Sequence, residues 1–393
     1  TILEKVVHKQ VTSYFTQNPD LSAIPAEQFA YRSHHSCEDA LTLCIDRWNR
    51  ALDNGDQCGV VFADMSKAFD RVQHTGLLGE LATTGLGGTV LKWFSDYLTN
   101  RSQQVTVNGE KGDTKPCTRG VPQGSVLGPL LFCVYIRRVP DIFHQSVVQL
   151  YADDIAFYVF GSDVATIMLR LQDSMRLLEQ YLDEKGLLLN PTKTQFMLIR
   201  RPALPALSPA LYLTCKGIVI SPVSTVKYLG ILIDEHLTFR PQVEKVCSVV
   251  FAKLACFAHG RRNLSATARR TFFLSIIQST LEYASNAYVH CLKTTLYNRL
   301  VTVSHIAMKK AFGLDRMTPT ALVLQRCHLY SFEQRVNLKL YVLVYRCLSS
   351  ITSPLLQSLF LLRSVGPHTN ARTRGQDTAA LVLPTVHIGY GLR

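Results

Sequence analysis

The sequence predicts an α+β body followed by a largely helical domain. Up to about residue 235, short β-branched and aromatic runs alternate with helix-like apolar spacing, and from Pro241 onward the spacing is mostly helical. The charge changes at the same place. Residues 1–235 hold 22 Lys and Arg against 24 Asp and Glu, residues 236–330 hold 13 against 3, and residues 331–393 hold 7 against 2. The excess of basic residues after residue 235 predicts either a region that binds a polyanion or a solvated basic face.

Composition narrows the class of protein further. The 393 residues carry a net charge of +13, and 47% of them are hydrophobic, so a large core is expected. Eleven cysteines without a C-x-x-C pair predict reduced core thiols in an intracellular protein and argue against a zinc ribbon. No apolar run reaches about 18 residues, so no membrane span is expected. The chain opens on a helical stripe without a signal-peptide core, and we expect it to be part of a longer protein.

The apolar patterns define the predicted elements. Predicted helices cover residues 2–15, 36–53, 77–98 with a break at 85–88, and 164–182, the last capped by Ser162 and ended by Gly186. Predicted strands cover residues 58–63, 147–151, 155–159, 187–189 and 195–199, with hairpins around 104–112 and ending at 226–231.

Two adjacent aspartates, Asp153 and Asp154, interrupt the apolar stretch VVQLYADDIAFYV (147–159). The runs on either side predict two strands, so the pair is expected at the tip of a β-hairpin. Two neighbouring carboxylates repel each other, and a bound divalent cation removes that cost; all-oxygen ligands favour Mg²⁺ or Mn²⁺. The alternative is a solvated turn with two ordinary aspartates.

A third carboxylate favours the metal hypothesis. Asp64 ends the apolar strand of VVFADMSKAFDRV (60–72), just as Asp153 follows one. Together they could hold two cations about 4 Å apart, the arrangement used for in-line phosphoryl transfer. Asp70 is a weaker candidate, because it is expected inside a helix, where a capping or salt-bridge role is more common.

A glycine-rich segment, RGVPQGSVLGPLLF (119–132), lies between these two sites. Its glycines and prolines predict a turn before an apolar helix, and glycine permits close approach of the backbone to a ligand. Gln123 presents an amide that could meet a base or a sugar. A plain loop is the alternative.

Six blocks of the sequence resemble the motifs of one protein family and occur in the same order. They are FAYRSHHSCEDAL (29–41), FADMSKAFDRV (62–72), RGVPQGSVLGPLLF (119–132), LYADDIAF (150–157), GLLLNPTKTQFM (186–197) and VKYLGI (226–231). The chain resembles the reverse transcriptase of non-LTR retrotransposons of the LINE, Jockey and CR1 kind, most strongly over residues 1–235. The resemblance implies an RNA-directed DNA polymerase that transfers nucleotides to a primer 3′-hydroxyl by two-metal catalysis in target-primed reverse transcription.

The resemblance also implies a right-hand polymerase fold of fingers, palm with an antiparallel sheet, and helical thumb, followed by a helical extension. Residues 1–57 would be partial fingers and residues 58–235 the palm, with a finger insertion at about 75–118. Residues 236–330 would be the basic thumb, and residues 331–393 an extension of unknown role. The implied partners are an RNA template, a DNA primer or target and deoxynucleoside triphosphates, with no membrane. The implied locations are a cytoplasmic ribonucleoprotein and the nucleus.

Site residues are carried over by position. The implied ligands of two Mg²⁺ ions, with Mn²⁺ as a substitute, are Asp64, Asp153 and Asp154, and Lys193 would protonate the leaving pyrophosphate. The implied nucleotide-binding residues are Arg32, Met65, Phe69 as steric gate, Gln123 and Gly124. The implied primer grip is Tyr228, Leu229 and Gly230. The implied contacts to the template–primer backbone are Arg261, Arg262, Arg269 and Arg270. Without the resemblance, Phe69 would be read as a core side chain and Lys193 as an exposed loop lysine.

One departure from the family pattern keeps a second hypothesis open. The family usually has an Asn-Asp pair where this chain has Arg137 and Arg138. That reversal of charge could be tolerated drift or the mark of a decaying copy. The alternative function is therefore a catalytically inert remnant, or a domesticated protein that binds nucleic acid without polymerising it. The sequence leaves the oligomeric state and the template specificity undetermined.

Overall fold

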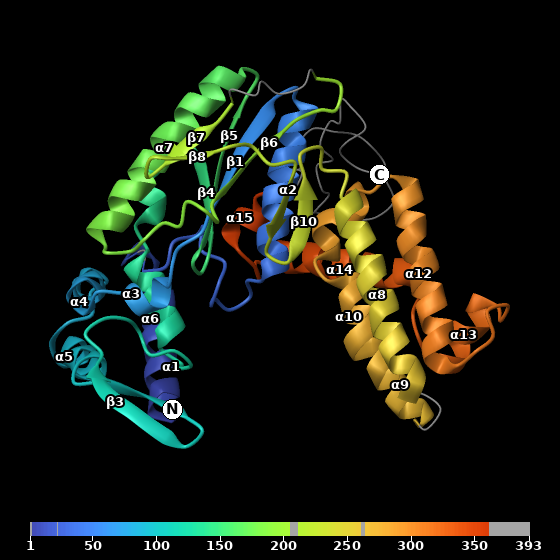
Figure 1. Ribbon diagram of the computed structural model, residues 1–393, viewed down its shortest axis with the longest axis horizontal. Helices are drawn as coiled ribbons and strands as arrows, with labels where there is room; N and C mark the ends of the chain where they lie inside the picture. The colour runs from blue at the N-terminus through green and yellow to red at the C-terminus, as the bar shows by residue number, and fades with distance from the viewer. Residues whose placement is uncertain (1, 22, 205–210, 261–263, 361–393) are drawn as a thin grey trace, which may run out of the picture. The chain divides into compact units, whose positions relative to one another are not determined.

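A computed structural model describes residues 2–21, 23–204, 211–260 and 264–360, and these form two compact units. The first unit comprises residues 2–33, 58–198 and 211–223, and the second comprises residues 34–57, 199–204 and 224–360, apart from the gaps just given. The predicted α+β class is confirmed, because the first unit combines helices with an antiparallel hairpin and the second is mostly helical (Figure 1).

The first unit is built on a four-stranded sheet in the order β4-β5-β1-β6. Its elements are α1 (Ile2–Gln17), η1 (Pro19–Leu21), β1 (Gln57–Ala63), α3 (Ala68–Arg71), α4 (His74–Thr83), α5 (Gly88–Leu98), β2 (Ser102–Val107), β3 (Glu110–Pro116), α6 (Gly128–Tyr135), η2 (Val139–Ile142), β4 (Val147–Tyr151), β5 (Asp154–Gly161), α7 (Val164–Glu184), β6 (Gln195–Ile199), β7 (Leu213–Cys215) and β8 (Ile218–Ile220).

Helix α7 covers the sheet and closes the core of this unit (Figure 1). Its predicted apolar stripe is fully buried and consists of Ile167, Leu171, Met175, Leu178 and Leu182. The predicted cap is wrong by one residue: Asp163, rather than Ser162, accepts hydrogen bonds from the backbone N–H groups of Ala165 and Thr166 at 3.3 and 2.8 Å. Asp163 has extended backbone geometry, which places its carboxylate over the free N–H groups of the first turn. Gly186 follows the helix end with a φ of 68°, as its predicted role requires.

Two other predictions about local structure need correction. Residues 187–189 do not form a strand; Leu189 makes only an isolated antiparallel bridge to Met65. Residues 213–234 contain two hairpins, β7–β8 and β9–β10, where one hairpin ending at 226–231 was predicted. Period-two patterning cannot separate short hairpins when each strand has only three or four residues. Part of the predicted proline-rich link, residues 205–210, lies outside the described residues.

The second unit contains α2, the β9–β10 hairpin and the helices that follow it. Its elements are α2 (Cys37–Asp53), β9 (Thr225–Tyr228), β10 (Ile231–Asp234), α8 (Arg240–Gly260), α9 (Ala266–Phe272), the π-helical η4 (Phe273–Gln278), α10 (Ser279–Glu282), α11 (Ser285–Tyr288), η5 (Val289–Cys291), α12 (Thr294–Phe312), α13 (Thr320–Cys327), α14 (Phe332–Leu348) and α15 (Pro354–Gln357). Across both units, no helix in the described ranges is long and apolar enough to cross a membrane.

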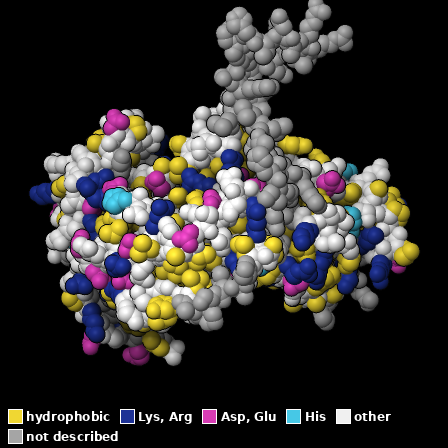
Figure 2. All heavy atoms as spheres, turned by 90° about the horizontal axis from the view of Figure 1, so that it is seen from above, with side chains coloured by type: hydrophobic (Ala, Val, Ile, Leu, Met, Phe, Trp, Pro, Cys, Tyr) yellow, Lys and Arg dark blue, Asp and Glu magenta, His cyan; other side chains and the backbone are white. Residues whose placement is uncertain are grey.

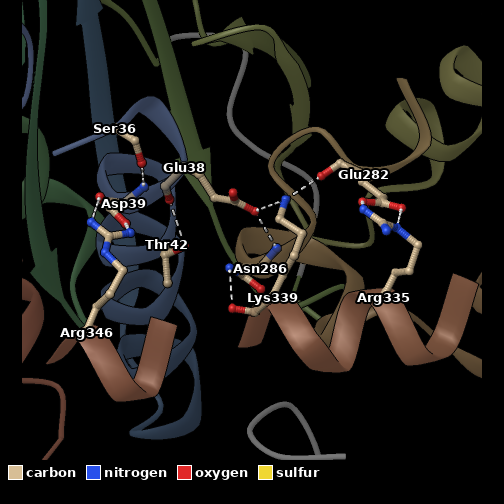
Figure 3. A network of polar contacts seen from close by, with 9 residues as sticks. All are labelled: Ser36, Glu38, Asp39, Thr42, Glu282, Asn286, Arg335, Lys339 and Arg346. Carbon is tan, nitrogen blue, oxygen red and sulfur yellow. Dashed lines mark hydrogen bonds and ion pairs between the residues drawn. The ribbon is translucent and has the colours of Figure 1, made fainter. Parts of the chain in front are cut away.

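Charged side chains join α14 to the acidic start of α2 and to the end of α10, all within the second unit (Figure 3). Arg346 pairs with Asp39 at 3.1 Å and Lys339 with Glu38 at 2.9 Å. Arg335 pairs with Glu282 at 2.5 Å. The side chain of Asp39 is only 2% exposed, so its charge depends on Arg346 for compensation.

The unexpected Arg137 and Arg138 are accommodated around one buried carboxylate of the first unit. Glu80 is 7% exposed and pairs with Arg137 at 2.9 Å, Lys185 at 2.5 Å and Arg138 at 3.4 Å. Arg137 also donates hydrogen bonds to Thr83 Oγ1 and to a backbone carbonyl of η1. Burial acts to raise the pKa of Glu80, but the hydrogen bonds and charges of Lys185 and Arg137 outweigh it and hold the pKa below its ordinary value.

Replacing Glu80 by Gln should therefore destabilise the protein strongly. The Glu80→Gln change would leave Arg137 and Lys185 without a counter-charge in a largely buried site, which costs about 3–5 kcal/mol. Urea unfolding would measure the loss. The matched control is Asp183→Asn, which removes a 2.6 Å pair with Lys216 whose side chains are 29% and 55% exposed, and should cost less than about 1 kcal/mol.

Lowering the pH should reduce the difference in unfolding free energy between Glu80→Gln and the wild type. Because the folded-state pKa of Glu80 is lowered, its stabilisation is present above the unfolded-state pKa and is lost as the pH falls through the folded-state pKa. Equal losses in Glu80→Gln and Asp183→Asn at neutral pH would show that the cluster contributes no more than a surface pair.

Candidate active site

Strand pairing brings the three predicted carboxylates to neighbouring strand ends. Asp64 directly follows β1, and β1 is hydrogen-bonded beside β5 in the sheet. Tyr151 pairs with Asp154 across the antiparallel β4–β5 hairpin, which leaves Ala152 and Asp153 as a two-residue turn. The predicted hairpin tip is therefore confirmed, with Asp154 as the first residue of β5.

The three carboxylates act on one another electrostatically. Burial raises the pKa of Asp154 to about 6, and the negative charges of Asp153 and Asp64 add to the shift. The pKa of Asp153 is also raised, by burial and then by the charge of Asp64, although a hydrogen bond to its own backbone opposes the shift. The fold thus holds like charges together at a free-energy cost.

The segment that follows α7 fixes the backbone of Asp64. The N–H of Asn190 donates to the Asp64 carbonyl at 2.8 Å, and the N–H of Asp64 donates to Thr194 Oγ1 at 3.4 Å. Thr194 Oγ1 donates in turn to the Asn190 carbonyl at 2.9 Å. Met65 bridges to Leu189 and is buried. The NPTKT block therefore contributes Asn190 and Thr194 as supports, which the sequence analysis missed by considering only Lys193.

Lys193 lies beside Asp64. Its Nζ atom is 3.9 Å from Asp64 Oδ2, and its side chain is 69% exposed. Asp64 Oδ2 is itself buried and has no hydrogen-bond partner within the described residues. A buried carboxylate oxygen without a hydrogen bond is costly, so this atom is suited to a cationic partner.

The donor set fits a hard divalent cation. The oxygens of Asp64, Asp153 and Asp154 are the ligand type that Mg²⁺ and Mn²⁺ prefer, and a cation would offset their repulsion. In the part of the chain that the structure describes, no three His, Cys, Asp or Glu side chains already stand in a metal-binding arrangement.

The glycine-rich segment pairs with the residues after Asp64. The N–H of Gly120 donates to the Val72 carbonyl at 2.8 Å, and the N–H of Val121 donates to the Phe69 carbonyl at 3.0 Å. Gly120 has a φ of 87°, and a Cβ atom there would lie 2.9 Å from the Asp70 carbonyl oxygen. Glycine is therefore required at this position by both backbone conformation and space.

Two expected nucleotide-binding residues of this segment are open to solvent. Gln123 is exposed, and its Nε2 donates to Asp70 Oδ1 at 2.7 Å, so Asp70 serves as an anchor for the loop. Gly124 has a φ of 77° and no atom within 4 Å of an added Cβ. A third expected nucleotide-binding residue, Phe69, lies in more packed surroundings. Phe69 is half-buried and stacks on Phe132 at a centroid distance of 4.4 Å.

Arg32 is oriented by backbone oxygens. Its Nη1 atom donates to the Pro25 carbonyl at 2.7 Å and to the Gln28 carbonyl at 3.2 Å. Tyr31, the preceding residue, has a φ of 57° and is about half exposed; the partial burial of its ring, together with nearby Cys133 and Asp153, raises the pKa of its hydroxyl. The FAYR block thus extends to the neighbourhood of Asp153.

The predicted primer grip is a tight turn in the second unit. Tyr228 is buried and pairs with Ile231 across the β9–β10 hairpin. The central residues Leu229 and Gly230 have φ values of 42° and 87°, as a type I′ turn requires. Tyr283 donates its hydroxyl to the Leu229 carbonyl at 2.8 Å, and Lys245 Nζ donates to the Gly230 carbonyl at 3.0 Å. These two supports come from distant segments and were missed by the sequence analysis.

The predicted backbone-contacting arginines are only partly described. Arg261 and Arg262 lie outside the described residues. Arg269 donates to the Phe312 carbonyl at 3.2 Å, and Arg270 donates to the His328 carbonyl at 3.4 Å, so both also stabilise helix packing. On the face shown in Figure 2, basic side chains are interspersed with acidic and hydrophobic ones.

Comparison with solved structures finds a distant likeness to telomerases. Telomerase from Candida albicans in complex with a TWJ fragment of telomeric RNA aligns with a TM-score of 0.42 and 12% identity, covering 76% of this chain and 55% of that one. Apo telomerase from Candida tropicalis aligns with a TM-score of 0.42 and 11% identity, covering 83% and 61%.

Sequence comparison finds closer relatives. The probable RNA-directed DNA polymerase from transposon BS of Drosophila melanogaster is 26% identical over 85% of this chain and 37% of its own length. The RNA-directed DNA polymerase from mobile element jockey of the same organism is 27% identical over 73% of this chain and 32% of its own length. The chain thus spans about a third of the length of these relatives. The resemblance to retrotransposon polymerases is confirmed.

The family model for reverse transcriptase (RNA-dependent DNA polymerase) matches residues 1–233, which is more than half of the chain. This match supports the right-hand polymerase fold that the resemblance implies. The chain therefore belongs to the reverse transcriptase (RNA-dependent DNA polymerase) family.

Proposed function

We propose that this chain is the polymerase part of a non-LTR retrotransposon protein, which copies an RNA template into DNA by extending a primer 3′-hydroxyl. One observation carries the proposal. Asp64 and the Asp153–Asp154 turn come from segments about 90 residues apart, and the pairing of β1 with β5 brings them within electrostatic range. Family membership supports the same chemistry.

The carboxylates would hold two Mg²⁺ ions, with Mn²⁺ as a substitute. When bound, such ions would stabilise the charge of the transferring phosphoryl group. The exposed Lys193 ammonium, 3.9 Å from Asp64 Oδ2, can donate a proton to the departing pyrophosphate. Arg32 would pair with the triphosphate through its guanidinium, which the Pro25 and Gln28 carbonyls orient.

The remaining assignments follow the family pattern. Gln123 and Gly124 would position the nucleotide and template, and Phe69 would exclude a 2′-hydroxyl. The β9–β10 turn would grip the primer, and the basic helices of residues 236–330 would track the template–primer backbone as the thumb. Residues 1–57 and 58–235 would serve as fingers and palm. The whole protein would act on chromosomal DNA as a ribonucleoprotein that enters the nucleus.

Primer extension tests the proposal directly. With an RNA template, a DNA primer, deoxynucleotides and Mg²⁺, we expect extension by the wild type and a loss of at least about 10²-fold in the Asp153→Ala/Asp154→Ala variant. Asp183→Ala, on the exposed face of α7, is the matched control and should keep full activity. Salt-dependent template–primer binding should be the same in all three proteins, because the proposed contacts to the template–primer backbone do not involve the substituted aspartates. Extension that survives the double substitution would refute the metal assignment.

Sugar discrimination tests the role of Phe69. Phe69→Ala should increase incorporation of ribonucleotides relative to deoxynucleotides by about tenfold or more, because the side chain that meets the 2′-hydroxyl is removed. Phe132→Leu is the control, since it disrupts the same ring stack from the fully buried side. If both variants retain wild-type discrimination, Phe69 is a core residue and not a gate.

The raised pKa of Asp154, caused first by burial and then by the charges of Asp153 and Asp64, predicts a pH-dependent stabilisation by Asp154→Asn in EDTA. The pKa of Asp154 is raised from 3.8 to about 6 in the folded protein, so the folded state loses stability relative to the unfolded state as the pH rises through this interval. The variant has no charge at position 154. It should melt about 2–4 °C higher than the wild type above pH 7, and this difference in melting temperature should shrink toward pH 4.

Asp163→Asn gives the opposite control for that measurement. Hydrogen bonds from Thr166 and Ala165 lower the pKa of Asp163 at the start of α7. Removing this charge should not raise the melting temperature at any pH. A gain for Asp154→Asn that is equal at pH 4 and pH 7.5 would contradict the predicted repulsion.

A further inference from the structure

The segment before Arg32 runs beside the strand that leads into the Asp153 turn. The N–H of Leu150 donates to the Glu27 carbonyl at 2.9 Å, and the N–H of Phe29 donates to the Leu150 carbonyl at 2.9 Å. Gln28 lies opposite Leu150 in a parallel bridge. Residues 27–29 therefore extend the sheet by one short stretch at β4.

The side chain of Gln28 reaches the turn itself. Gln28 is fully buried, and its Oε1 atom accepts hydrogen bonds from the N–H of Ala30 at 3.0 Å and from the N–H of Ala152 at 2.9 Å. Ala152 is the first residue of the two-residue turn and has a φ of 55°. An alanine in this left-handed conformation is strained, so contacts that hold it there matter for the position of Asp153.

The orientation of the Gln28 amide follows from its partners. Both neighbouring groups are backbone N–H donors, so the atom that faces them must be the oxygen. Nε2 is buried and has no hydrogen-bond partner in the described part of the chain. A buried donor without a partner is costly, so Nε2 does not favour glutamine at this position. The residue is favoured by the two hydrogen bonds that its oxygen accepts.

The backbone of Gln28 provides a second connection, because its carbonyl accepts the 3.2 Å hydrogen bond from Arg32 Nη1. We propose that Gln28 is a positioning residue, which holds the Ala152–Asp153 turn against the segment that carries Arg32. This inference rests on the proposed function of the carboxylates and of Arg32. The role of Gln28 would be to keep the turn at a fixed position relative to the Arg32 guanidinium, which would bind the triphosphate.

A volume-matched substitution separates positioning from packing. Gln28→Met keeps the size of the side chain and removes the acceptor. The matched control is Gln172→Met on α7. Gln172 makes the same kind of contact in the same unit, accepting from the N–H of Thr214 at 2.8 Å and donating to its carbonyl at 3.0 Å.

Amide hydrogen exchange measures the positioning without relying on activity. In Gln28→Met we expect exchange at Ala152 to accelerate at least about tenfold, because its N–H loses its acceptor. Gln172→Met should leave Ala152 protected, although its melting temperature should fall by a similar amount. Unchanged exchange at Ala152 in Gln28→Met would overturn the proposal.

Kinetics then tests the consequence for the site. Gln28→Met should lower kcat by about 10–100-fold and raise the Mg²⁺ concentration for half-maximal extension, with KM for template–primer unchanged, because a displaced turn misplaces Asp153. Gln172→Met should leave kcat within about twofold of the wild type. Equal kcat in both methionine variants would overturn the proposal. If the wild type itself fails to extend primers, the proposed function fails, and the exchange data alone decide whether Gln28 holds the turn.

Discussion

The first unit depends on holding like charges together where neighbouring strands end. Asp64 follows β1, and the Asp153–Asp154 turn joins β4 to β5, with β5 hydrogen-bonded beside β1. Burial, and then the charges of neighbouring carboxylates, raise the pKa values of Asp153 and Asp154. Hydrogen bonds oppose this cost, because residues 188–194 bond to the segment at Asp64 and residues 27–29 bond to Leu150 and Ala152. The apolar flanks that make the aspartates conspicuous in the sequence are the buried scaffold that this repulsion requires.

Local pattern was sufficient to predict the hairpin, the strand before Asp64 and the buried stripe of α7, because each follows from periodicity within about twenty residues. It was not sufficient for contacts between distant segments. Gln28 lies in a stretch predicted as neither helix nor strand, and its importance appears only when Leu150 and Ala152 are placed beside it. The error at the start of α7 has a different cause, since Ser162 and Asp163 are both good caps and only backbone geometry separates them.

The structure shows how the Arg137–Arg138 pair is accommodated. Arg137 is 9% exposed and has a carboxylate, a hydroxyl and a carbonyl as partners. An uncompensated arginine at such a depth would be strongly destabilising. Glu80 supplies the compensation from α4, so the reversal of charge is matched elsewhere in the same unit. A departure from a family pattern therefore has to be judged together with the residues that surround it in space.

The same reasoning gives part of residues 331–393 a definite place. Three cations of α14 meet the acidic start of α2 and the end of α10 (Figure 3). Asp39, whose side chain is 2% exposed, would be left as a buried charge without Arg346. Helix α14 therefore supplies the counter-charge for Asp39 of α2, although about 300 residues separate the paired side chains in the sequence. It follows that residues 332–348 are an integral part of the second unit.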